Sequence, residues 1–125
     1  MDTFYFELES QEQFDNLINS SKICVIDFYA SWCGPCKSLS NLLSSAVKKD
    51  NILSLKHKNN LSKYDNMNDG IVFIKVNVDK FSKLVDIFNV SSIPYVVFYK
   101  YGKLQEKIIN GADYIEIINI INELL

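Results

Sequence analysis

The sequence is poor in cysteine and histidine, the residues from which disulfide frameworks and most transition-metal sites are built. Only three of its 125 residues are cysteine and only one is histidine. Three cysteines do not make the framework of paired disulfides that stabilises small secreted domains. The single histidine, His57, stands in a polar stretch with no acid, cysteine or second histidine in a motif around it. We therefore interpret His57 as an exposed loop residue and not as a ligand.

The sequence also lacks an excess of positive charge and any long apolar run. Its 13 Lys and Arg residues are balanced by 15 Asp and Glu residues, for a net charge of -2, so no basic surface for nucleic acid is expected. No apolar stretch approaches the length that spans a bilayer. Residues 1–6, Met-Asp-Thr-Phe-Tyr-Phe, are too short and too acidic for a secretory signal. These absences favour a cytoplasmic protein without a membrane span.

The first part of the chain alternates between strand and helix patterns, and its length predicts one domain over 1–125. Residues 3–8 are rich in aromatic and apolar side chains and predict a short strand. Ser10 and Gln13 have the spacing of a capping box, and the apolar stripe that follows predicts a helix. The run 23–29, Ile-Cys-Val-Ile-Asp-Phe-Tyr, predicts a strand buried on both faces.

The pattern stops from about residue 49 to residue 70, where asparagine and lysine dominate. We interpret 49–70 as a polar surface insert. Two explanations stay open: a compositional bias without function, or a loop that binds a partner, since unusually long loops are often functional. Leu53 and Leu55 precede its charged part and would extend the preceding helix or pack against it.

Strand and helix patterns resume after the insert. Residues 71–78 predict another buried strand, and Asp79 is expected to cap the helix that follows. The runs 95–99 and 104–109 are too close in sequence for a parallel connection, so they predict a β-hairpin. Apolar residues at helical spacing from Tyr114 predict a C-terminal helix. The predicted fold class is therefore α/β, an open mixed sheet with helices on both faces.

Two of the cysteines, Cys33 and Cys36, flank Gly34 and Pro35 directly after the strand 23–29. Apolar residues then recur at helical spacing, which places Cys33 at a helix start, where free N–H groups and the helix dipole favour a thiolate. We predict that Cys33 is an exposed nucleophile and that Cys36, one turn deeper and more buried, resolves the mixed disulfide. The same spacing occurs in half of a zinc or iron–sulfur site. No second pair completes such a site in this sequence, and we expect no metal.

The strand 23–29 also contains a carboxylate and the third cysteine. Burying Asp27 among apolar residues is costly unless the group is protonated, hydrogen-bonded or paired, and burial should raise its pKa. A perturbed pKa does not by itself indicate catalysis, because an aspartate in a purely structural contact with a lysine also has a shifted pKa. Cys24 is expected to be a buried residue without chemistry.

The run Trp32-Cys33-Gly34-Pro35-Cys36-Lys37, after a buried strand that carries an aspartate, resembles the signature of the thioredoxin family. The resemblance extends to Lys75 within 73–79, to the pair Ile93-Pro94 and to Gly111-Ala112, and it is weakest over 49–70. It implies the thioredoxin fold, with the active site at the carboxyl end of the central strand that contains Asp27.

The resemblance implies roles for the matching residues. Asp27 would act as general acid and base for Cys36, with Lys75 as a supporting charge near it. The base rate favours a trans bond before Pro94, whereas the resemblance implies a cis bond facing the disulfide. The backbone beside that bond would then pair with an extended substrate segment. The residues implied to contact substrate are Trp32, Ile93, Pro94 and Gly111, with Trp32 at the surface beside the nucleophile.

Three positions depart from the family pattern. Tyr29 stands where many members carry tryptophan, Asn41 replaces the usual helix-kinking proline, and Tyr95 follows the cis-proline position, where threonine is common. None of these departures removes a catalytic group. A bulky Tyr95 would alter which partners fit the groove.

The leading hypothesis is a thiol-disulfide oxidoreductase that reduces protein disulfides through Cys33 and Cys36. It would bind no cofactor and would receive electrons from NADPH through a thioredoxin reductase. Its expected partners are that reductase and proteins with disulfides, and not nucleic acid or membranes. The competing hypothesis is a thioredoxin-fold binding or scaffold subunit that docks into a larger assembly through 49–70.

Overall fold

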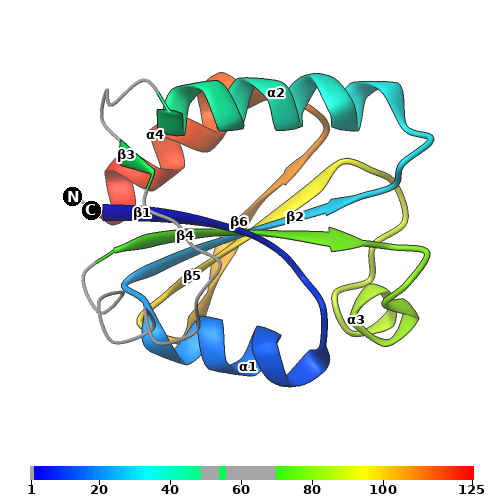
Figure 1. Cartoon of the computed structure of the whole chain (residues 1–125), viewed down its shortest axis with the longest axis horizontal. Helices are drawn as coiled ribbons and strands as arrows, with labels where there is room; N and C mark the ends of the chain where they lie inside the picture. Colours follow the sequence, from blue (N-terminus) through cyan, green and yellow to red (C-terminus); the bar gives the residue numbers. More distant parts are fainter. Residues whose placement is uncertain (1, 49–53, 56–69) are drawn as a thin grey trace.

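In the part of the chain that the structure describes, a six-stranded mixed sheet forms the middle layer of the fold, and helices cover both of its faces (Figure 1). The computed structural model describes residues 2–48, 54–55 and 70–125. The elements in chain order are β1 (Asp2–Glu7), α1 (Gln11–Ser20), β2 (Ile23–Tyr29), α2 (Gly34–Lys48), β3 (Ser54–Leu55), β4 (Ile71–Asn77), α3 (Ser82–Ile87), β5 (Tyr95–Lys100), β6 (Lys103–Asn110) and α4 (Tyr114–Leu124). The predicted α/β class is confirmed.

Strand β2 lies in the interior of the sheet, whose order is β3-β1-β4-β2-β5-β6. It pairs in parallel with β4 and antiparallel with β5. Six of its residues, from Ile23 to Phe28, are buried, and only Tyr29 is partly exposed. An uninterrupted apolar run fits such a place, because both faces of an interior strand lie under helices.

The two faces of the sheet have separate apolar cores. Helices α1 and α3 cover one face, and α2 and α4 cover the other (Figure 1). In the first core, residues of α1 and α3 pack against alternate residues of the strands. The helices contribute Phe14, Leu17 and Leu84, and the strands contribute Ile26, Phe28 and Ile74, among others. In the second core, residues of α2 and α4 pack against the intervening strand residues. The helices contribute Leu39, Leu43 and Ile117, and the strands contribute Val25 and Phe73, among others. Since strand side chains alternate, Asp27 shares the face of Val25, beneath α2.

The predicted capping of α1 is confirmed. The side-chain oxygen of Ser10 accepts a hydrogen bond from the N–H of Gln13 at 3.1 Å. The Gln13 side chain reaches back and accepts from the N–H of Glu9 at 2.8 Å, one residue before the cap. These two bonds satisfy backbone donors around the first turn of the helix.

The predicted capping of α3 by Asp79 is wrong. Helix α3 begins at Ser82, after Phe81, which makes no side-chain cap. A turn intervenes between β4 and the helix, because the N–H groups of Lys80 and Phe81 both donate to the carbonyl of Asn77. Asp79 lies within this turn, and its own N–H donates to Oδ1 of Asn77 at 2.9 Å. Its carboxylate is therefore available for a contact elsewhere.

The predicted hairpin is formed by β5 and β6, which pair antiparallel. Both residues of its turn adopt left-handed backbone angles, with φ 49° at Tyr101 and φ 78° at Gly102. Glycine adopts this conformation without steric cost, and such a turn matches the twist of the flanking strands.

The segment 49–70 contains a strand that its composition does not indicate. Ser54 and Leu55 form β3, which pairs in parallel with β1 at Asp2 and Thr3. Leu55 therefore extends the sheet and not the helix, while β3 lies against α2, in line with the second alternative. The predicted polar loop is wrong at 54–55, because two residues are too few to give a periodic signal. The predictions for 49–53 and 56–69, including His57, fall outside the described residues.

Candidate active site

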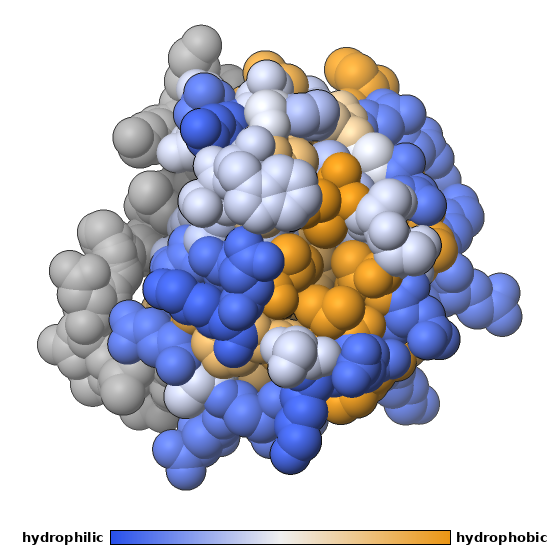
Figure 2. All heavy atoms as spheres, turned by 90° about the vertical axis from the view of Figure 1, so that its right-hand side faces the viewer, coloured by the Kyte–Doolittle hydropathy of each residue, from blue (hydrophilic) through white to orange (hydrophobic). Residues whose placement is uncertain are grey.

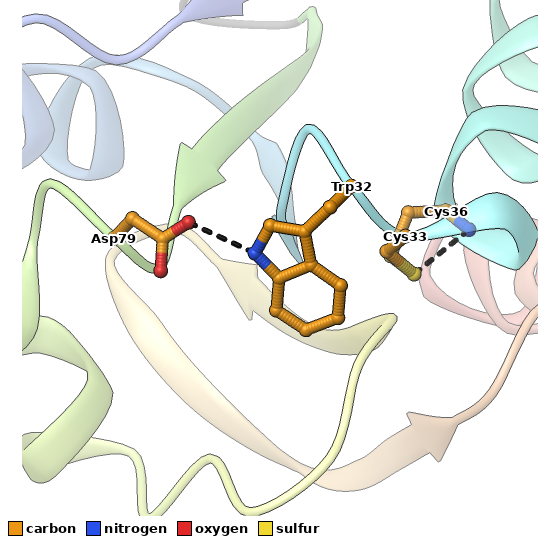
Figure 3. Close-up of a disulfide and its surroundings, with 4 residues drawn as sticks. All are labelled: Trp32, Cys33, Cys36 and Asp79. Carbon is orange, nitrogen blue, oxygen red and sulfur yellow. Dashed lines mark hydrogen bonds between the residues drawn. A yellow bond between two sulfur atoms is a disulfide. The ribbon is translucent and has the colours of Figure 1, made fainter.

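Cys33 and Cys36 form a disulfide between the carboxyl end of β2 and the first turn of α2. The carbonyl of Cys33 accepts the N–H of Lys37 at 3.2 Å, as a residue at a helix start does. The Cys33 sulfur accepts a second hydrogen bond, at 3.2 Å, from the N–H of Cys36 (Figure 3). An N–H of the first helical turn thus points at this sulfur, where it favours a thiolate once the disulfide is reduced.

The predicted exposure of Cys33 is wrong for the disulfide form. Cys33 is 6% exposed and Cys36 is 1% exposed, so both are buried although their order is as predicted. Both sulfurs belong to a small apolar cluster with Ala30, and partly buried Val78 and Ile93 pack against it. These neighbours, together with the bond to Cys36, cover the Cys33 side chain.

Asp27 is buried as predicted, and its environment raises its pKa. The residue is 2% exposed, and neither carboxylate oxygen has a hydrogen-bond partner among the described residues. The pKa of Asp27 is raised to about 7: burial raises it most, the nearby charge of Lys75 lowers it, and the charge of Glu7 adds a smaller rise. An acid with a pKa near neutrality can both accept and release a proton at physiological pH.

Lys75 lies beside Asp27 but makes no ion pair with it. The register of β2 and β4 pairs the two residues directly. The ammonium lies over the ring of Tyr29, with 4.2 Å from Nζ to the ring centroid. The hydroxyl of Tyr29 in turn donates to Glu7 at 2.5 Å. Sequence reasoning missed the contribution of Glu7, because it depends on the register between β1 and β4.

Trp32 lies at the surface, as the family resemblance implies, and is 70% exposed. Its indole N–H donates to a carboxylate oxygen of Asp79 at 3.1 Å (Figure 3). The carboxylate that was expected to cap α3 therefore orients this tryptophan. The exposed ring lies next to the disulfide in sequence and presents a large apolar area to a partner.

The loop before β5 faces the disulfide region and contains a cis peptide bond between Ile93 and Pro94. The Pro94 carbonyl accepts from the N–H of Gly111 at 2.9 Å. A second bond, from the Ser92 hydroxyl to Oδ1 of Asn110 at 2.6 Å, also joins this loop to the end of β6. No described residue hydrogen-bonds to the backbone of Ile93. Its N–H and C=O are available to pair with an extended chain.

The end of the molecule that contains α3 and the β4–α3 turn carries an apolar area bordered by hydrophilic residues (Figure 2). A contiguous exposed apolar area of this kind is typical of a surface that meets another protein. The partly exposed side chains that pack against the disulfide cluster are those of Tyr29, Val78 and Ile93. The disulfide thus lies beside partly exposed apolar side chains.

Cys24, the remaining cysteine, is buried and free. Its sulfur lies 3.1 Å from the Ser21 hydroxyl and 3.5 Å from the Leu17 carbonyl. Burial raises the pKa of its thiol to about 12, so it holds its proton, as predicted for a residue without chemistry. Within residues 2–48, 54–55 and 70–125, no cluster of three His, Cys, Asp or Glu side chains could hold a metal ion. None of the helices described there is long and apolar enough to cross a membrane.

The chain is similar in sequence and in structure to known thioredoxins. The family model described as "Thioredoxin" matches residues 6–123. A thioredoxin of Neurospora crassa is 30% identical over 105 residues, which are 84% of this chain and 69% of that protein. Thioredoxin 1 of Plasmodium falciparum is 31% identical over 104 residues, 83% of either chain. The oxidised form of mitochondrial thioredoxin 3 from Saccharomyces cerevisiae superposes with a TM-score of 0.70 at 28% identity, covering 94% of this chain and 92% of that one.

Proposed function

Because the chain belongs to the thioredoxin family and is a thiol-disulfide oxidoreductase, we propose that its specific activity is the reduction of disulfides in other proteins. The observation that carries the proposal is the position of the dithiol. Cys33 immediately precedes α2, and its sulfur accepts a hydrogen bond from the N–H of Cys36. Ile93 packs against the same cluster, and no described residue hydrogen-bonds to its backbone. Such a site can activate a thiolate and can receive an extended protein segment.

The reaction begins with the reduced protein. The Cys33 thiolate attacks one sulfur of the substrate disulfide; a mixed disulfide forms, and the other substrate sulfur leaves as a thiolate. The Cys36 thiol then loses its proton and attacks the Cys33 sulfur. The second substrate sulfur leaves, and both substrate sulfurs end as thiols. Two electrons have then passed from the Cys33 and Cys36 dithiol to the substrate, and Cys33 and Cys36 are joined in a disulfide.

Asp27 supplies the proton acceptor for the second step. The Cys36 sulfur is buried, so an ordinary hydrated base does not reach it easily. Asp27 lies on the α2 face of the sheet with both oxygens unoccupied by described residues. When ionised, it takes the Cys36 proton, and it returns a proton when the disulfide is reduced again.

The groove at the cis peptide bond would hold the substrate. An extended segment would pair with the backbone of Ile93 next to Pro94, with Gly111 at one side, while exposed Trp32 would contact the same partner. Recognition through backbone atoms reads little sequence, which favours a general reductant. Tyr95 follows this groove but is itself buried, so its ring is not part of the open surface.

The cycle needs an external source of electrons, and none of its steps needs a cofactor bound to this chain. We include in the proposal that NADPH supplies these electrons through a thioredoxin reductase. A reducing compartment such as the cytoplasm belongs to the same proposal, because a reductant must itself be kept reduced there.

Trapping tests the proposed order of attack. With Cys36→Ser, Cys33 should still attack protein disulfides but stay joined to them, so cell extract should yield adducts that a reductant releases. Cys33→Ser should yield none, and Cys24→Ser, the matched control, should turn over like wild type in an insulin reduction assay. Capture by Cys33→Ser as efficient as by Cys36→Ser would contradict the assignment of nucleophile and resolving thiol.

A further inference from the structure

Tyr29 makes two contacts that the mechanism above does not use. Its hydroxyl donates to Oε2 of Glu7 at 2.5 Å, and its ring lies against the Lys75 ammonium at 4.2 Å. The two partners come from other strands, Glu7 from β1 and Lys75 from β4. Since β4 lies between β1 and β2, the Tyr29 side chain reaches from its own strand past Lys75 to Glu7.

Lys75 stands between two carboxylates. The register pairs it with Asp27 on β2 and with Glu7 on β1, and paired residues of parallel strands point to the same face of a sheet. The two carboxylates differ in setting, because Asp27 is buried whereas Glu7 is exposed. A flexible ammonium would reach the exposed carboxylate at little desolvation cost, and the buried one would then lose its counter-charge.

Tyr29 acts against this outcome in two ways. The ring belongs to the same strand as Asp27, two residues further on, and it holds the ammonium on its face, 4.2 Å from the ring centroid. The face of an aromatic ring attracts a cation, and the attraction strengthens when the pair is desolvated. The hydroxyl meanwhile occupies one oxygen of Glu7 with a short hydrogen bond to a charged acceptor, a strong class of bond.

We propose that Tyr29 is a positioning residue that keeps Lys75 as the counter-charge of Asp27, by holding the ammonium on its ring and by binding the rival carboxylate of Glu7 with its hydroxyl. The proposal rests on the proposed function in one point only, the use of Asp27 as acid and base. Tyr29 packs against the cluster that contains Cys33 and Cys36, but it transfers no proton or electron in this scheme.

The other groups around Asp27 do not substitute for this arrangement. From β1, Tyr5 shares a hydrogen bond with Ser40 at 3.0 Å, and burial raises its pKa to about 12, so it is neutral near pH 7. From β5, the residue paired with Asp27 is Val96, which is apolar. Helix α2 contributes Cys36 and the exposed Lys37. A pocket of about 360 Å³ has Tyr29, Cys36, Lys37 and Lys75 in its lining.

Tyr29→Phe tests the proposal without changing the size of the ring. The loss of the hydroxyl frees Glu7 to attract Lys75, so the pKa of Asp27 should rise by roughly 0.5, equivalent to about 0.7 kcal/mol. Glu7→Gln should lower this pKa, because it removes the rival carboxylate together with its charge. The measurement is the carboxyl carbon shift of Asp27 against pH, by NMR on the full-length oxidised protein.

Two backgrounds serve as controls. Tyr29→Phe should have no effect when Glu7→Gln is already present, and none when Lys75→Met is present, because the rival or the ammonium is then missing. An unchanged Asp27 pKa in Tyr29→Phe alone, or an equal rise in the Lys75→Met background, would overturn the proposal. The pH profile of mixed-disulfide resolution should move with the pKa. If the pKa moves while the profile stays fixed, positioning by Tyr29 stands and the role of Asp27 in the proposed function fails.

Discussion

Strand β2 buries one titratable group toward each face of the sheet, and the two faces treat these groups differently. On the α1 face, Cys24 lies against the Ser21 hydroxyl and the Leu17 carbonyl, which satisfy its weak donor. On the α2 face, both oxygens of Asp27 lack a described hydrogen-bond partner. Burial raises the pKa of both groups, to about 12 for the thiol and about 7 for the carboxyl.

The same physical cause therefore has opposite chemical results. A thiol with a pKa near 12 holds its proton at every physiological pH and packs like an apolar residue. A carboxyl with a pKa near 7 exchanges its proton where the cell operates. The difference teaches that burial alone does not make a site. The group must also titrate near the working pH and lie on the face where the reacting sulfurs are.

Replacing single cysteines by alanine should give the largest effect on turnover. Cys33→Ala should abolish turnover of a disulfide substrate, because no other described thiol is placed at a helix start. Cys24→Ala should keep wild-type turnover at temperatures where the protein is folded. The assay is insulin reduction with a chemical reductant. Loss of turnover in Cys24→Ala with an intact fold would break the contrast between the two faces.

The cost of the Asp27 charge should appear in the pH dependence of stability. Its pKa of about 7 in the fold lies above the ordinary 3.8, so the folded protein binds this proton more tightly than the unfolded chain does. The contribution of Asp27 to stability is thus present in full below about pH 4 and is lost as the pH rises through about 7. A shift of this size corresponds to at most about 4 kcal/mol.

Asp27→Asn removes this charge and should flatten that pH dependence. Denaturant unfolding at a series of pH values measures the effect, with wild type as reference. The variant should be the more stable protein above about pH 7, and the two proteins should converge below about pH 4. Parallel stability curves for the two proteins would show that Asp27 is not a high-pKa carboxyl.

The same Asp27→Asn variant should resolve mixed disulfides more slowly, by on the order of 10²-fold, the lower end of what a positioned acid or base contributes. Stopped-flow measurement of the second step, after Cys33 has attacked, isolates this effect from substrate binding. The first step should change little, because Cys33 is activated by the helix start. A matched control is Asp79→Asn, which changes a surface carboxylate near Trp32 and leaves the buried one in place.

Ser21→Ala should give the smallest effect and concern the α1 face only. The Ser21 hydroxyl donates to the Leu17 carbonyl at 3.0 Å and lies beside Cys24. Its loss should reduce the free energy of unfolding by about 1 kcal/mol, the usual net value of one hydrogen bond, with no change in redox activity. A change in the rate of disulfide exchange would show that the two faces are coupled.

Local sequence signals predicted much of this molecule. Ser10 with Gln13 marks the start of α1, and the run from Ile23 to Tyr29 is long and apolar enough to identify an interior strand. The spacing after Cys36 identifies α2 and thereby the position of Cys33. These features depend on neighbouring residues in the chain, so they can be predicted without knowledge of the sheet order.

Features that depend on tertiary register could not be predicted in this way. Asp79 matches the position of a helix cap in the sequence, but a turn separates it from the start of α3. Its carboxylate instead accepts a hydrogen bond from the indole N–H of Trp32. The contact of Tyr29 with Glu7 exists only because β1 and β2 both flank β4. The strand β3 is two residues long, and Val78 and Ile93, which pack against the disulfide cluster, are distant from Cys33 in sequence.

The most direct test of this account is the pKa of Asp27 in the wild-type protein, followed through its carboxyl carbon signal from about pH 2 to about pH 9. The account predicts a midpoint of about 7, because burial disfavours the charged form and no described hydrogen bond compensates. A midpoint near the ordinary 3.8 would contradict it. The carboxyl would then be ionised throughout the working range, and it could not hold and release the proton of Cys36.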